Sequence, residues 1–62
     1  MKLIIDGRKK TLSHKGDIAS LLRKLKIRRE EVVVKLNGRL APETAALKAR
    51  DEVEVLRVVF GG

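Results

Sequence analysis

The sequence predicts an α+β fold in which one helix packs on one face of a mixed sheet of four to five strands. Short stretches at both ends and in the middle of the chain alternate apolar and polar residues, which is typical of half-buried strands. One stretch, from residue 18 to residue 25, has helical spacing instead. A single helix covers only one face of a sheet, and 62 residues make one small domain.

The first quarter of the chain predicts a hairpin. Residues 1–6 alternate as a strand with an apolar face at positions 1, 3 and 5. Asp6-Gly7 suits the positive φ angles of a two-residue hairpin turn. Residues 8–13 follow as a polar strand, and their basic side chains discourage further pairing there. We therefore expect this strand at an edge of the sheet.

A helix is predicted next. Asp17 is placed to cap the free N–H groups of its first turn. Apolar residues then recur at the i, i+3, i+4, i+7 spacing of one buried face: Ile18, Leu21, Leu22 and Leu25. We expect the helix to end near residues 27–28.

The second half of the chain completes the sheet. It predicts a strand over 31–37, a short strand over 39–41 and a last strand over 52–59. Asn37-Gly38 signals a second hairpin turn, and Leu47 is expected to anchor the irregular segment 43–51 in the core. With the first and last strands parallel at the centre, this order gives the β-grasp (ubiquitin-like) arrangement. The domain would span 1–60, with a flexible tail at 61–62.

Four stretches carry a family resemblance over nearly the whole chain: Met1–Gly7, Lys15–Ile18 before Leu21-Leu22, Val32–Pro42 and Val53–Gly62. In these stretches the chain resembles the ThiS/MoaD family of β-grasp sulfur carriers and the small archaeal ubiquitin-like modifiers. The tail looks closest to the archaeal modifiers and to the ThiS type. MoaD-type chains are usually longer and carry prolines before the final glycines, which disfavours a molybdopterin role.

The terminal Gly61-Gly62 is the candidate reactive group. Glycine has no Cβ, so two glycines can thread a narrow channel, whereas the alternative is a merely frayed chain end. The resemblance implies that an activating enzyme adenylates the Gly62 carboxylate with ATP and Mg²⁺. The product would then be thiocarboxylated for tRNA thiolation or the thiamine pathway, or conjugated to target lysines through an isopeptide bond. The chain itself would be neither an enzyme nor a cofactor-binding protein.

Strand alternation also predicts a docking surface for the activating enzyme. On the sheet face away from the helix it gathers Ile4, Val33, Leu56 and Val58, with Arg57 and Phe60 beside them. The alternative is that these are ordinary scattered surface aliphatics. The other expected partners are a sulfur-transfer enzyme or target proteins, with tRNA met only indirectly.

Charge leaves two interpretations open. Fifteen basic and eight acidic residues give a net charge of +7, which suits either a nucleic-acid surface or the solvated surface of a thermophile protein. We favour the second, because the basic residues spread along the chain. A small basic nucleic-acid-binding module and a non-covalent β-grasp regulatory subunit remain alternative functions.

The remaining signals exclude some classes of site. There is no cysteine, and His14 has no acid or cysteine beside it in the sequence, so we expect neither a metal site nor a catalytic histidine. No apolar run approaches the length of a membrane span, and no secretory leader is evident. We expect a monomeric cytoplasmic protein.

Overall fold

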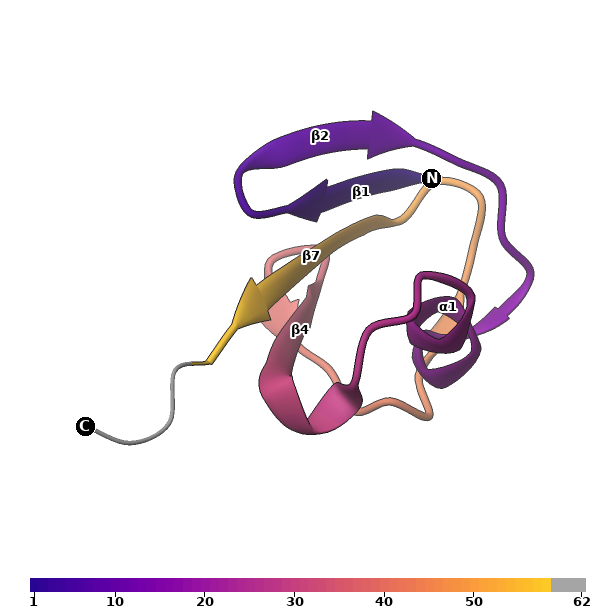
Figure 1. Ribbon diagram of the computed structural model, residues 1–62. Helices are drawn as coiled ribbons and strands as arrows, with labels where there is room; N and C mark the ends of the chain where they lie inside the picture. Colours follow the sequence, from indigo (N-terminus) through magenta and orange to yellow (C-terminus); the bar gives the residue numbers. More distant parts are fainter. Residues whose placement is uncertain (59–62) are drawn as a thin grey trace.

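A computed structural model describes residues 1–58 of the chain (Figure 1). The strands are β1 (Lys2–Ile5), β2 (Arg8–Thr11), β3 (Gly16–Asp17), β4 (Val32–Leu36), β5 (Arg39–Leu40), β6 (Ala46–Leu47) and β7 (Glu52–Arg57). The helices are α1 (Ile18–Lys24) and a short 3₁₀ helix, η1 (Arg29–Glu31).

The main sheet has the strand order β2-β1-β7-β4-β5. The central strand β7 runs parallel to β1 and antiparallel to β4, so the sheet is mixed. The helix α1 lies to one side of this sheet (Figure 1) and buries its apolar stripe. The predicted β-grasp arrangement of one helix on a mixed sheet is therefore confirmed.

The core lies between α1 and the inner face of the sheet. Val53 and Val55 of β7 are 0% and 1% exposed, which puts the central strand at the centre of the core. The buried apolar residues are Leu3, Ile18, Leu21, Leu22, Val34, Leu47, Val53 and Val55. Leu47 thus anchors its segment as expected.

Both predicted hairpin turns have left-handed backbone at their two central residues. The φ angles are 51° and 76° at Asp6 and Gly7, and 53° and 84° at Asn37 and Gly38. Positive φ at both central residues is the pattern of a type I′ turn, whose twist matches the flanking strands. These turns fix the register of β1 on β2 and of β4 on β5.

The helix is shorter than predicted. It ends at Lys24, and Lys26 has a φ of 59°. The Lys26 N–H donates to Arg23 O at 3.1 Å, and the Ile27 N–H donates to Leu22 O at 2.9 Å. This pair of bonds is a Schellman motif, which normally has glycine where Lys26 stands. A lysine in that place gives no stop signal in the sequence.

The segment predicted to be irregular contains β6, which is one strand of a small second sheet. Within it, β3 pairs with β6, with Gly16 opposite Leu47 and Asp17 opposite Ala46. Two-residue strands are too short to show an alternating pattern, so the sequence did not predict them. The last strand ends at Arg57, and the end predicted for it at Val59 lies outside the described residues.

Two half-buried aspartates hold local structure. Asp17 caps α1 by accepting from the Ser20 N–H at 2.8 Å. Asp51 accepts from the Asn37 side chain at 3.0 Å and from the Lys48 N–H at 2.7 Å, which joins the β4–β5 turn to the approach to β7. The Ser20 N–H lowers the pKa of Asp17, and the Asn37 side chain, with the Lys48 N–H, lowers the pKa of Asp51.

Replacing Lys26 by glycine should stabilise the protein. A residue with a Cβ is strained at the left-handed φ of 59°, and glycine is not. The net gain in the free energy of unfolding is about 1 kcal/mol, after the greater entropy of glycine in the unfolded chain is subtracted. The matched control is Lys24→Gly, inside the last turn of α1, which should cost about 1 kcal/mol. Urea unfolding measures both, and a Lys26→Gly variant less stable than the wild type would contradict the motif.

Stability should fall in acid through Asp17 and Asp51. Their folded pKa values lie below the ordinary 3.8, so their contribution is complete above that value and is lost as the pH falls through the folded pKa values. In the double variant Asp17→Asn/Asp51→Asn, the thermal midpoint should change less with pH below about pH 4 than in the wild type. The fold should be kept, since asparagine can still cap a helix. Calorimetry across this range tests it, and an unchanged acid slope would refute it.

Candidate functional site

The outer face of the sheet, opposite α1, carries two rows of side chains across the strands. One row runs from Lys9 of β2 through Ile4, Glu54 and Lys35 to Leu40 of β5, each residue directly opposite the next. A second, shorter row pairs Val33 of β4 with Leu56 of β7. This face therefore carries the charged Lys9, Glu54 and Lys35 along its longer row, and its apolar side chains lie on β1, β4, β5 and β7.

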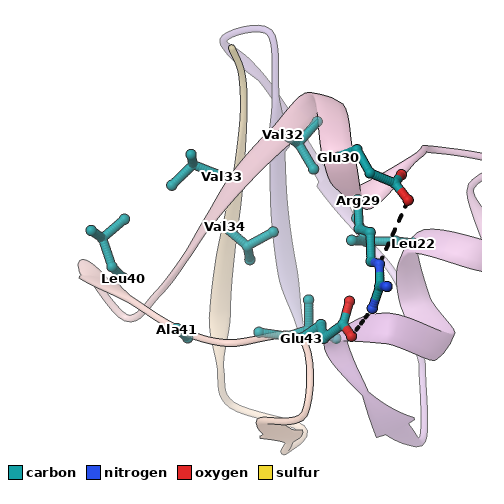
Figure 2. A pocket seen from close by; sticks show the side chains of 10 residues that line it. Leu22, Arg29, Glu30, Val32, Val33, Val34, Leu40, Ala41 and Glu43 are labelled. Atoms are coloured by element: carbon teal, nitrogen blue, oxygen red, sulfur yellow. Dashed lines mark hydrogen bonds and ion pairs between the residues drawn. The ribbon is translucent and has the colours of Figure 1, made fainter.

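Three residues form the exposed apolar part of this face, and we call them the apolar patch. Val33 and Leu56 are each 37% exposed, and Leu40 is 69% exposed. In Figure 2, Val33 and Leu40 point to the same side of β4, away from Val34. Val33 and Leu56 were predicted to lie on this face, whereas Leu40 was missed. Counting through the Asn37-Gly38 turn finds it, because Leu40 lies opposite the outward Lys35.

The other predicted docking residues are arranged around the patch. Ile4 is half-buried, and Glu54 separates it from Lys35 and Leu40 in the same row. Arg57 belongs to the opposite face of β7, and its Nε lies 3.4 Å from Asp6 Oδ2 at the β1–β2 turn. Half-buried Val58 follows the strand.

The chain leaves the sheet beside η1. The Val58 N–H donates to Glu31 O at 2.9 Å, which extends the pairing of β7 along β4 by one more bond. The predicted residues Phe60, Gly61 and Gly62 lie outside the described residues. The segment that carries them thus starts from a fixed point at the end of the central strand, next to the apolar patch.

A pocket of about 350 Å³ opens on the β5 side of β4 (Figure 2). Its apolar wall comes from α1, β4 and the chain after β5, including Leu22, Val32 and Ala41. Arg29 crosses its rim and forms ion pairs with Glu43 and, at 3.8 Å, with Glu30. The hydrogen bond to Glu43 raises the pKa of Arg29, so this cation stays charged. No sequence pattern predicts this pocket, because its walls are far apart in the chain.

His14 and Ser20 lie in contact but are not a catalytic pair. His14 Nε2 is 2.9 Å from Ser20 Oγ, and Ser20 Oγ donates its proton to Asp17 O at 2.9 Å. The histidine nitrogen must then donate to the hydroxyl, so it cannot act as a base toward it. Gly16 belongs to the same cluster, since a Cβ there would lie 2.6 Å from Ser20 Oγ. These residues build the start of α1.

Two further classes of site find no support in the described part of the chain. Residues 1–58 contain no group of three or more His, Asp or Glu side chains placed to hold a metal ion. Among the same residues, no helix is long and apolar enough to cross a membrane.

The fold and the surface first define a class, a ubiquitin-like β-grasp protein whose central strand ends beside an apolar patch and whose sequence ends in Gly-Gly. Comparison with known proteins then gives the family. The model of the ThiS family matches residues 4–62. The chain therefore belongs to the ThiS family, whose members are small sulfur carriers rather than enzymes.

Solved structures agree with this assignment. The crystal structure of the thiamine biosynthesis protein ThiS from Geobacter metallireducens has a TM-score of 0.69 and 32% identity, with 100% of each chain covered. The NMR solution structure of a thiamine biosynthesis protein from the same organism has a TM-score of 0.65 and 32% identity, covering 100% of this chain and 88% of that one. A search of curated proteins gave no significant match.

Proposed function

We propose that this protein carries sulfur as a thiocarboxylate on Gly62. The observation that carries the proposal is that the family match extends through the terminal Gly61-Gly62. The fixed start of the terminal segment supports it, since Val58 follows the central strand and its N–H donates to Glu31 O. In this proposal residues 1–60 form the docking domain and residues 61–62 are the tail that enters the partner's active site.

The chemistry needs a partner, because a carboxylate is a poor electrophile. An activating enzyme that uses ATP and Mg²⁺ joins a Gly62 carboxylate oxygen to the α-phosphorus of ATP and releases pyrophosphate. A hydrosulfide equivalent from a sulfur-transfer enzyme then attacks the acyl carbon, and AMP leaves. The Gly62 carboxylate has thereby exchanged one oxygen for sulfur. The absence of a Cβ at Gly61 and Gly62 favours close approach of both reagents.

The apolar patch is the proposed docking surface for the activating enzyme. Val33, Leu40 and Leu56 are all large and exposed, Leu56 lies two residues before Val58, and interfaces are most apolar at their centres. Ile4 and Val58 would extend the contact, and Arg57 with Phe60 would meet the enzyme where the tail begins. The charges of Glu54 and Lys35 beside the patch would fix the orientation of docking.

The solved relatives are described as thiamine biosynthesis proteins, which supports an acceptor in that route. Sulfur transfer to tRNA and conjugation to protein lysines begin from the same activated Gly62. The three outcomes therefore differ only in what receives the acyl or sulfur group. We propose the thiamine route as the main one, in the cytoplasm, with the monomer as the carrier.

Incubation with the cognate activating enzyme, ATP, Mg²⁺ and a sulfur source should raise the intact mass by one oxygen-for-sulfur exchange. The control variant lacks Gly61 and Gly62, and it should stay unmodified while keeping the wild-type spectrum, because none of the buried core residues is removed. Mass spectrometry of both proteins decides the matter. An unchanged wild-type mass, under conditions where the enzyme consumes ATP in the presence of the carrier, would refute the proposal.

A further inference from the structure

Positive charge is concentrated in one half of the chain. Residues 1–29 contain ten basic and two acidic residues, a net charge of +8. Residues 30–62 contain five basic and six acidic residues, a net charge of −1. The prediction that the basic residues merely spread along the chain misses this asymmetry, which typically points to a polyanionic partner.

The fold turns this asymmetry into a surface. Residues 1–29 supply β1, β2 and α1, which form one edge of the sheet and the layer beside it (Figure 1). Arg8 and Lys10 lie opposite the core-facing Ile5 and Leu3, so they extend from β2 on the side of α1. Lys24 of α1 reaches the segment that follows β2, because its Nζ donates to Ser13 O at 3.2 Å.

We define the basic surface as Arg8, Lys10, Lys15 and Lys24, all of which are exposed. The ion pairs of the described residues involve Arg28, Arg29 and Arg57 and none of these four. A thermally adapted surface would instead join its cations to carboxylates in networks. The positive charge of the basic surface is therefore available to a partner.

The surface chemistry favours a nucleic acid over a protein or a membrane. The large exposed apolar side chains of the described residues, Val33, Leu40 and Leu56, lie on β4, β5 and β7, away from the basic surface. Protein interfaces have apolar centres, and membrane-surface elements insert apolar side chains. Interfaces with nucleic acids are more polar and strongly positive.

The shape of the basic surface indicates which kind of nucleic acid it fits. The helix α1 has seven residues and buries Ile18, Leu21 and Leu22 against the sheet, so it is not free to enter a major groove. The chain has no Tyr or Trp, which leaves little for stacking on single-stranded bases. A surface of exposed cations without a protruding helix suits the wide, shallow minor groove and flanking phosphates of A-form RNA.

We propose that the basic surface binds the sugar-phosphate backbone of double-helical RNA. This inference goes beyond the sulfur-carrier function and does not require activation of Gly62. The basic surface is on β2, α1 and the segment between them, whereas the apolar patch is on β4, β5 and β7. An RNA and an activating enzyme would thus contact different sides of the same carrier.

Fluorescence anisotropy with a labelled RNA hairpin tests the inference. The wild-type protein should bind with a dissociation constant of about 1–100 μM at physiological salt, as expected for backbone contacts. The variant Arg8→Gln/Lys10→Gln/Lys24→Gln should bind about tenfold or more weakly, and its log–log salt slope should fall by roughly two to three. Both effects follow from the loss of three phosphate contacts.

The matched control removes the same charge elsewhere. Arg39→Gln/Lys48→Gln/Arg50→Gln changes three exposed basic residues of the second half of the chain and should bind nearly as the wild type does. Equal weakening of both variants would show a net-charge effect and overturn the inference. So would absence of RNA binding, equal binding to a DNA hairpin of the same sequence, or tighter binding to poly-glutamate.

A tail deletion separates this inference from the carrier function. The protein without Gly61 and Gly62 should bind the RNA hairpin as the wild type does, although it cannot be thiocarboxylated. Loss of RNA binding on this deletion would contradict the placement of the site on β2 and α1. Amide spectra of every variant confirm that the fold is kept.

Discussion

The pairing of β7 with both of its neighbours is the interaction on which the rest of the structure depends. This strand runs parallel to β1 and antiparallel to β4, and within residues 1–58 it is the strand that joins the two halves of the main sheet. Its Val53 and Val55 are fully buried beneath α1. Parallel neighbouring strands need a long crossover connection. The chain between β1 and β7 provides this connection.

The same strand connects the fold to the function. Its period of two places Val55 in the core and Leu56 on the outer face, next to Val33 of β4. Beyond it, Arg57 pairs with Asp6, and Val58 bonds to Glu31. The central strand therefore ends beside the apolar patch, at the residue from which the proposed reactive segment continues. A carrier needs such a layout, because docking and delivery of the carboxylate must occur together.

The basic surface is separate from the apolar patch. The net positive half of the chain forms β1, β2 and α1, whereas the apolar patch belongs to the other half of the sheet. A small domain thereby presents two surfaces of different chemistry, and each has room for its own partner. The ion pairs around η1, where Arg29 joins Glu30 and Glu43, lie on the α1 side of β4 (Figure 2) and involve no residue of the basic surface.

Most of the fold could be predicted from the sequence, because its strands and turns follow local rules. Asp6-Gly7 and Asn37-Gly38 form the turns that their dipeptides favour, and alternation placed Val33 and Leu56 on the outer face. The end of the helix could not be predicted, since Lys26 holds a conformation usually given to glycine.

Parts of the site were missed for a different reason. Leu40 required the strand register to be followed through a turn, from the outward Lys35 across to β5. The pocket beside Arg29 and the basic surface combine segments that are distant in the sequence, and only the tertiary structure brings them together. Local periodicity carries no information on such combinations.

The most direct test of the account is to map where the activating enzyme contacts the carrier. Titration of the isotope-labelled protein with its activating enzyme, followed by amide NMR, measures this residue by residue. The account predicts that the largest perturbations occur at Val33, Leu40 and Leu56, with β2 and α1 little affected. Perturbations centred on Lys10 and Lys24 instead would contradict the assignment of the docking face and of the separate basic surface.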